Sequence, residues 1–208
     1  MKTPDMKTTQ KLDLYQLHKD EYAAPKKPVL LRTKPAQYLA ISGQGAPGGE
    51  RFTACIGALY GMAFTIKMTR KFAGQGDYAV CKLEGQWFFE GDPARIPKEQ
   101  WRWKLMIRTP DFITEADRKP ALAALLKKGK SREVEDVKLE TMDEGQCVQM
   151  LHVGPYEKEG ETVALMRSFA ESKGFILAGP HHEIYLSDPR RVPPERLKTI
   201  LRLPVVKG

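Results

Sequence analysis

One pattern occurs twice along the chain and constrains the fold more than any other feature: a strand, a glycine break, a helix and then two more strands. Gly43 and Gly154 each follow a strand-like segment and precede a helical pattern. The expected segments are 37–42, 51–72, 78–89 and 101–107 in the first half, and 146–153, 161–173, 182–186 and 198–203 in the second. A unit that repeats in the same order predicts two structurally equivalent halves.

We therefore expect an α+β fold of two tandem pseudo-symmetric β-α-β-β repeats. Its antiparallel sheets would carry helices on one side and a ligand groove on the other, because a small sheet needs cover on at least one face. Residues 1–34 are interpreted as a charged N-terminal extension with a short helix and a linker, and 35–205 as the domain. Half one would cover about 35–110, a connecting helix and linker about 111–143, and half two about 144–205.

The composition is that of a globular protein with its own core: 208 residues, 41% hydrophobic and 29% charged. The longest apolar stretch, Cys55–Ile66, is shorter than the roughly 20 residues that span a bilayer. Residues 1–10 do not resemble a secretory signal. Three widely spaced cysteines predict reduced thiols rather than disulfides or zinc ligands. We expect a cytoplasmic protein without a membrane span.

The net charge of +8 raises the question of a nucleic-acid partner. Half of that charge lies in residues 1–34, a segment too short for a helix-turn-helix domain. The remaining basic residues are scattered, without interleaved aromatic residues. We expect no nucleic-acid partner and no complete transcription regulator, and the oligomeric state stays open.

Gly43, Gly45 and Gly48 match the G-x-G-x-x-G spacing that brings a dinucleotide to a helix N-terminus. Pro47 removes an amide donor, and no acidic residue stands about 20 positions further on. Antiparallel strands are expected next, in place of a parallel unit. The segment is interpreted as a glycine-rich turn, and we predict no cofactor.

The strand-like segment 182–186 carries the central candidate, Glu183. Because side chains alternate along a strand, Ile184 and Leu186 form an apolar face suited to packing on a helix. Glu183 and Tyr185 then point to the opposite face, toward the expected groove.

Two histidines precede Glu183, so a metal site has to be considered. On a strand, His181 shares the face of Glu183 and His182 points the other way. The three residues do not converge on one side, and we predict no metal.

Aromatic residues are dense around the expected strand pairs. A carboxylate that faces an aromatic wall suits flat apolar ligands, which stack, and cations, which are attracted by charge and by π-faces. The candidate ligand-binding residues are Glu183, Trp87, Tyr156, Tyr185, Tyr60 and Trp103.

Three segments carry a more specific signal: Leu83-Glu-Gly-Gln-Trp87, Trp101-Arg-Trp-Lys-Leu-Met-Ile-Arg108 and above all His182-Glu-Ile-Tyr-Leu-Ser-Asp-Pro189. Together they resemble the GyrI-like small-molecule-binding family, which is related to effector-binding domains of multidrug-responsive regulators. The likeness runs from about Pro28 to Val205. One departure is Ala46-Pro47-Gly48, where the family commonly carries Asp-Pro-Asn.

The resemblance implies a stand-alone domain in which Glu183 lies at the bottom of an aromatic pocket. Its ligands would be planar, hydrophobic and often cationic molecules, bound for protection against xenobiotics or toxins. As an alternative, some members are hydrolases that open the cyclopropane ring of DNA-alkylating natural products, with Glu183 as general base and Tyr156 as hydrogen-bond donor. A third alternative is a protein-interaction role that modulates a topoisomerase. The sequence leaves these alternatives open.

Overall fold

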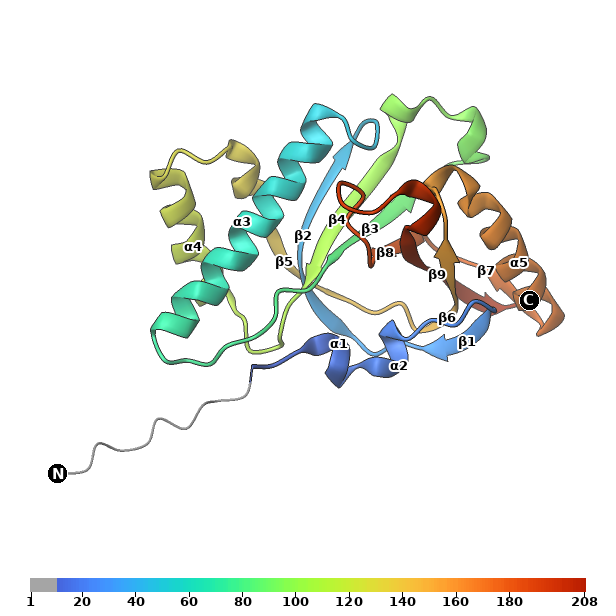
Figure 1. Ribbon diagram of the computed structural model, residues 1–208, viewed down its shortest axis with the longest axis horizontal. Helices are drawn as coiled ribbons and strands as arrows, with labels where there is room; N and C mark the ends of the chain where they lie inside the picture. Colours follow the sequence, from blue (N-terminus) through green and yellow to red (C-terminus); the bar gives the residue numbers. More distant parts are fainter. Residues whose placement is uncertain (1–10) are drawn as a thin grey trace.

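The computed structural model describes residues 11–208, which form one long antiparallel sheet with helices packed on it (Figure 1). The helices of this part of the chain are α1 Leu14–Leu17, α2 Lys19–Tyr22, α3 Glu50–Phe72, α4 Glu115–Lys127 and α5 Glu159–Ser172. The strands are β1 Val29–Arg32, β2 Ala36–Gln44, β3 Leu83–Phe88, β4 Arg102–Arg108, β5 Lys138–Met142, β6 Gln146–Val153, β7 Phe175–Leu177, β8 His181–Tyr185 and β9 Lys198–Lys207.

The strand order repeats within the sheet, which runs β1-β6-β9-β8-β3-β4-β2-β5, with β7 paired to β9. In each half the first strand pairs with the third, and the third pairs with the second. These neighbours are β2-β4-β3 in one half and β6-β9-β8 in the other. The α+β fold with a repeated topology is confirmed.

The two halves join edge to edge rather than as separate sheets. β3 and β8 pair antiparallel, with Gly85 opposite Glu183 and Trp87 opposite His181. We call this β3–β8 pair the seam. The backbone hydrogen bonds of the seam bring residues about 100 positions apart in sequence into direct contact, and they bring the candidate Glu183 to the middle of the molecule.

The helices α3 and α5 cover the same face of the sheet. Paired residues of neighbouring strands share a face, and one such row runs Leu105, Gly85, Glu183, Leu201 and Met150. Leu105 at one end of the row packs in the core with α3, and Leu201 and Met150 at the other end pack with α5. Glu183 therefore lies on the helix-bearing face, and its strand β8 lies between α3 and α5 (Figure 1).

The groove was predicted on the face of the sheet without helices, but it lies on the face that the helices cover. The hollow described below lies between α3 and α5, on the face that the helices cover. The helices stand apart where the two halves meet, so the seam is left uncovered there. The alternation argument for Glu183 holds, but the helix that covers the Ile184 face is the short α2, through Tyr22.

α3 is long and apolar enough to span a membrane by length and composition, with a mean hydropathy of 1.2. Its side chains Leu59, Met62 and Ile66 are buried in the core that the sheet provides. A core helix passes the same test, so this finding alone is weak evidence of a membrane span. The residues Ala121 and Leu125 of α4 belong to the same core.

The N-terminal segment is more integrated than the predicted helix and linker. Within the described residues 11–34, α2 lies on the second face of the sheet, Leu14 of α1 packs in the core with α3, and β1 pairs with β6 as an edge strand. Tyr22 packs on Ile184 and Ile200. The expected linker before the second half likewise contains a strand, β5, which pairs with β2.

Candidate functional site

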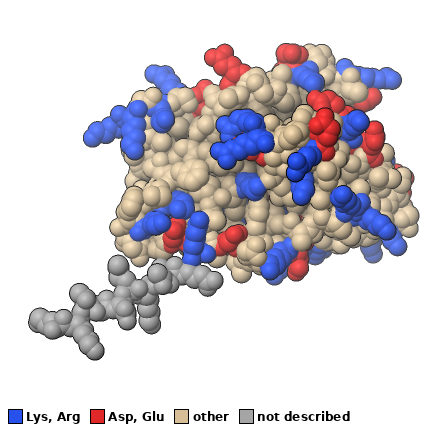
Figure 2. Space-filling model, in the orientation of Figure 1, with Lys and Arg blue, Asp and Glu red and all other residues tan. Residues whose placement is uncertain are grey.

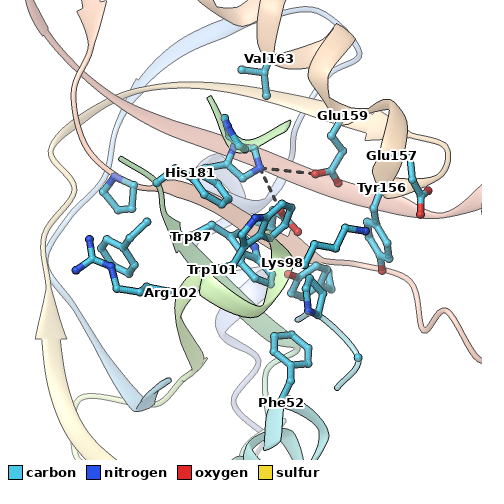
Figure 3. Close-up of a pocket in the computed structure, with 18 of the residues that line it drawn as sticks. Phe52, Trp87, Lys98, Trp101, Arg102, Tyr156, Glu157, Glu159, Val163 and His181 are labelled. Atoms are coloured by element: carbon cyan, nitrogen blue, oxygen red, sulfur yellow. Dashed lines mark ion pairs between the residues drawn. The ribbon is translucent and has the colours of Figure 1, made fainter. Parts of the chain in front are cut away.

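A hollow of about 2030 Å³ opens above the seam, between α3 and α5 (Figure 3). Its floor comes from β3 and β8, its sides come from the two helices, and the segment that joins β3 to β4 contributes part of the rim. This volume exceeds the usual range for drug-sized ligands, roughly 300–1,000 Å³. The hollow is large enough for an extended polycyclic molecule.

One wall of the hollow is aromatic and comes from the first half. Phe52 of α3 stacks on Trp87 of β3 with ring centroids 5.7 Å apart. Trp101 meets Trp87 edge-on at 5.7 Å and Phe89 edge-on at 4.9 Å. The Nε1 of Trp87 is buried without a hydrogen-bond partner among the described residues. Trp87 itself is only 4% exposed, and the partly buried Phe52, Phe89 and Trp101 present the surface on which a flat ligand can stack.

Three ionisable groups from the second half lie beside the aromatic wall: Glu159 from the first turn of α5, at one side of the hollow, and His181 and Glu183 from β8, on its floor. His181 Nε2 lies 3.1 Å from Glu183 Oε1 and 3.6 Å from Glu159 Oε2 (Figure 3). The side chains are exposed by only 17%, 11% and 9% for His181, Glu183 and Glu159. We call these three residues the triad.

Burial and mutual repulsion set the protonation of the triad. Burial, followed by repulsion from Glu183, raises the pKa of Glu159 to about 8, although His181 opposes the shift. Burial alone would lower the pKa of His181, but Glu159 and Glu183 outweigh burial and raise this pKa to about 9. At neutral pH the imidazole is therefore charged and pairs with Glu183, while Glu159 holds its proton.

Two tyrosines border the triad. Tyr156, in the turn before α5, meets Tyr185 of β8 edge-on, with centroids 6.0 Å apart. Burial and then Glu183 raise the pKa of Tyr156 to about 12, so its hydroxyl stays a hydrogen-bond donor. Tyr185 lies against Gly85 across the seam, where an added Cβ would be 3.0 Å from the Tyr185 hydroxyl.

Behind the seam, a buried ionic network fixes β8, the strand that carries His181 and Glu183. His182 Nε2 lies 3.0 Å from Glu84 Oε2, and His182 Nδ1 lies 2.9 Å from Glu144 Oε1. Arg202 reaches Glu144 Oε2 at 3.1 Å, and the Tyr22 hydroxyl donates to Glu84 Oε1 at 3.0 Å. The network connects β8 to β3, β9 and α2, which holds His181 and Glu183 in register.

The structure brings five of the six predicted ligand-binding residues together. Tyr60, Trp87, Tyr156, Glu183 and Tyr185 all line the hollow. Tyr60 also accepts a hydrogen bond from the Leu83 amide at 3.1 Å. Their ligand-binding and catalytic roles stay predictions.

Trp103 was predicted in the ligand site but lies in the core. It is 1% exposed, and its ring packs so closely on Gly43 that a Cβ there would be 2.2 Å from it. Its Nε1 donates to the Gly45 carbonyl at 3.2 Å. The Trp103 ring leaves no room for a Cβ at position 43, which explains the glycine there. This is the first glycine of the G-x-G-x-x-G spacing, which is also typical of dinucleotide sites.

Sequence reasoning missed Glu159, His181 as a partner of Glu183, and Phe52. The expected second helix began at Glu161, which left Glu159 outside it. Phe52 stands four positions before Ile56 and eight before Tyr60, and all three line the hollow, so a longer reading of the helical period would have included it.

The triad also offers a metal ion one ligand atom from each residue, all within 4.8 Å of one another. The His181 contacts are equally those of an imidazole shared between two carboxylates. The prediction that no metal is bound therefore stays a prediction. Figure 2 shows Lys and Arg interspersed with Asp and Glu on the visible face, and the expectation of no nucleic-acid partner likewise stays open to test.

The fold and the aromatic hollow are those of a small-molecule-binding domain. The family model for the GyrI-like small molecule binding domain matches residues 27–206, and the chain belongs to this family. No curated protein matches the chain.

Solved structures from Listeria innocua are similar over almost the whole chain. An uncharacterized conserved protein is 40% identical, with a TM-score of 0.89, and the match covers 94% of this chain and all of that one. A hydrolase encoded by lin2189 is 38% identical, with a TM-score of 0.88, and the match covers 95% of this chain and all of that one. The C-terminal domain of EcmrR shares the fold at 11% identity, with a TM-score of 0.56 over 88% of this chain and 98% of that one.

Proposed function

We propose that the protein is a hydrolase that adds water to a planar, aromatic small molecule held in the hollow. The observation that carries this proposal is the triad, a carboxylate–imidazole–carboxylate group buried beside an aromatic wall. Two carboxyl groups with different surroundings can serve as the general acid and the general base of an enzyme. The 38% identity to a hydrolase over the whole of that chain supports the proposal.

The family resemblance suggests a substrate with a strained cyclopropane ring. Water is a weak nucleophile, so the ring must be conjugated to an acceptor such as a carbonyl group, which takes the electron pair of the breaking C–C bond. Glu183 would accept a proton from the attacking water. Tyr156 would donate a hydrogen bond near the site of reaction. Ring strain and positioning lower the demand on the catalytic groups.

Capture of aromatic cations by Glu183 receives less support from the geometry. A counter-charge for a ligand should be an unneutralised carboxylate, but His181 lies 3.1 Å from Glu183 and is charged at neutral pH. The triad thus favours neutral ligands over cations.

Sequestration without turnover is the second candidate function. It is favoured by the size of the hollow and by the continuous aromatic surface of Phe52, Trp87 and Trp101, which would hold a flat molecule without any reaction.

The test is to incubate the protein with a planar alkylator that contains a cyclopropane and to analyse the products by mass spectrometry. A hydrolase converts excess compound into the product with one added water. A sequestering protein leaves the compound unchanged and protects only one equivalent per site. A protein that neither converts nor retains the compound contradicts both functions.

A further inference from the structure

A second group is needed in any such hydrolysis. The electron pair released by ring opening collects on the acceptor oxygen of the substrate, and a proton supplied there stabilises it. Tyr156 was predicted from the sequence as a hydrogen-bond donor. The structure offers a stronger acid, Glu159, which sequence reasoning missed.

The two carboxyl oxygens of Glu159 have different surroundings. Its Oε2 faces His181 at 3.6 Å, while its Oε1 is buried without a hydrogen-bond partner among the described residues. The residue is 6% exposed and lines the hollow. A buried polar atom without a partner is costly unless a ligand satisfies it. A neutral carboxyl group at this place can donate to a ligand.

The surroundings of Glu159 favour the protonated form. Glu183 repels a second negative charge, and burial disfavours any charge. His181 and Tyr185 on β8 and Tyr156 in the turn before α5 are also ionisable groups near it. The start of α5 favours an anion and so opposes the shift. Desolvation and repulsion outweigh it, in agreement with the raised pKa.

We propose that Glu159 is the general acid of this site and that His181 returns its proton after each turnover. This inference rests on the proposed hydrolase function. Water forms a bond to a cyclopropane carbon, the ring C–C bond breaks, and its electrons move to the acceptor oxygen. Glu159 gives its proton to that oxygen, and Glu183 takes one from the water. One molecule of water is added in total.

His181 can then restore the starting state. After the reaction Glu159 is charged and Glu183 is protonated. The Nε2 proton of His181 passes to Glu159, and the same nitrogen then takes the proton from Glu183. Both transfers use a single nitrogen that lies between the two carboxylates, 3.6 Å and 3.1 Å away.

The test compares hydrolysis by the wild type, Glu159→Gln and Glu161→Gln. Glu161 lies two residues along the same helix and is exposed, so its variant is a matched control. The wild-type rate should fall as the pH rises through about 8, because the acid is lost. Glu159→Gln should lower kcat roughly 100-fold or more and remove this alkaline fall, in a variant that still unfolds cooperatively.

A substrate series separates a catalytic from a structural role. Electron-withdrawing groups that stabilise the acceptor oxygen as an anion reduce the need for an acid, so the loss in Glu159→Gln should shrink along the series. An equal loss for all substrates, or an unchanged pH profile in the folded variant, overturns the proposal.

A binding probe keeps the inference testable if no hydrolysis occurs, in which case the proposed function has failed by itself. The infrared carbonyl stretch of a bound planar ketone should shift to lower frequency, and the shift should disappear above pH 8 in the wild type. A shift that is the same at all pH values, or the same in Glu159→Gln, would overturn donation by Glu159.

Discussion

His181 Nε2 and Glu183 Oε1 lie 3.1 Å apart on the floor of the hollow, two residues along the same strand. Because this contact neutralises Glu183, its removal should change which ligands bind. We expect His181→Gln to raise the affinity for planar aromatic cations at least about tenfold and to leave neutral molecules of the same shape almost unaffected. Fluorescence titration with a matched cationic and neutral pair measures both. Unchanged cation affinity would show that His181 does not mask the carboxylate.

Gly85 leaves room for the Tyr185 side chain, so an alanine there should affect ligand binding more than folding. An alanine Cβ would lie 3.0 Å from the Tyr185 hydroxyl, so the tyrosine beside Glu183 must shift by a few tenths of an ångström. We expect Gly85→Ala to remain folded but to lose affinity for planar ligands. Gly61→Ala is the control, since its Cβ would make an ordinary contact at 3.7 Å with Leu125. Equal affinities in the two variants would contradict a role for the Tyr185 position.

Substitution of Trp87 should weaken ligand binding, whereas substitution of Trp103 should lower stability. Trp87 lines the hollow, so Trp87→Ala should weaken the binding of a planar aromatic ligand by about 1–3 kcal/mol. Trp103 fills the core, so Trp103→Ala should lower the free energy of unfolding by about 3–5 kcal/mol. Urea unfolding and calorimetric titration give the two values. A stable Trp103→Ala variant with weakened binding would show that Trp103 belongs to the ligand site.

The network behind the seam predicts how stability depends on pH. Burial lowers the pKa of His182, but Glu144 and Glu84 outweigh it and raise the folded-state pKa to about 9, above the ordinary 6.5. Its contribution is therefore complete below pH 6.5 and is lost as the pH rises through 9. Burial raises the pKa of Glu144, but His182 and Arg202 lower it to about 2, below the ordinary 4.5. That contribution is complete above pH 4.5 and is lost as the pH falls through 2.

Stability from this network should therefore be greatest between about pH 4.5 and 6.5. Urea midpoints measured from pH 5 to 9 should decline on the alkaline side. His182→Gln should make this decline shallower, with the rest due to His181 and Glu159, which shift in the same direction. An identical decline in wild type and His182→Gln would contradict a charged His182 in the folded protein.

The sequence contained enough to predict the elements and their repeat. Glycine breaks and helical periods located the long helices within two residues, and 146–153 matches β6 at both ends. The side of the groove could not be predicted, because it depends on how β3 meets β8 across about 100 residues of chain. Once Gly85 pairs with Glu183, that residue shares a face with the helix-packed Leu105 and Leu201.

The candidate site was predicted in part for a similar reason. Alternation along one strand placed Glu183 and Tyr185 together, since this is a local property. Glu159 comes from another element and meets His181 only after α5 packs on the sheet. Trp103 alternates like a site residue, but its position under α3 and against Gly43 makes it part of the core.

Turnover by wild type and Glu183→Gln in ¹⁸O-labelled water tests the central claim most directly, with the exposed Glu195→Gln as control. A cyclopropane-bearing planar substrate is supplied in excess of protein, and the labelled, water-added product is followed by mass spectrometry. We predict many turnovers by wild type and control, and a rate at least roughly 100-fold lower in Glu183→Gln, which should still bind neutral substrate. Equal turnover by wild type and Glu183→Gln, or no labelled product with any of the three proteins, would contradict the assignment of Glu183 as the base that activates water.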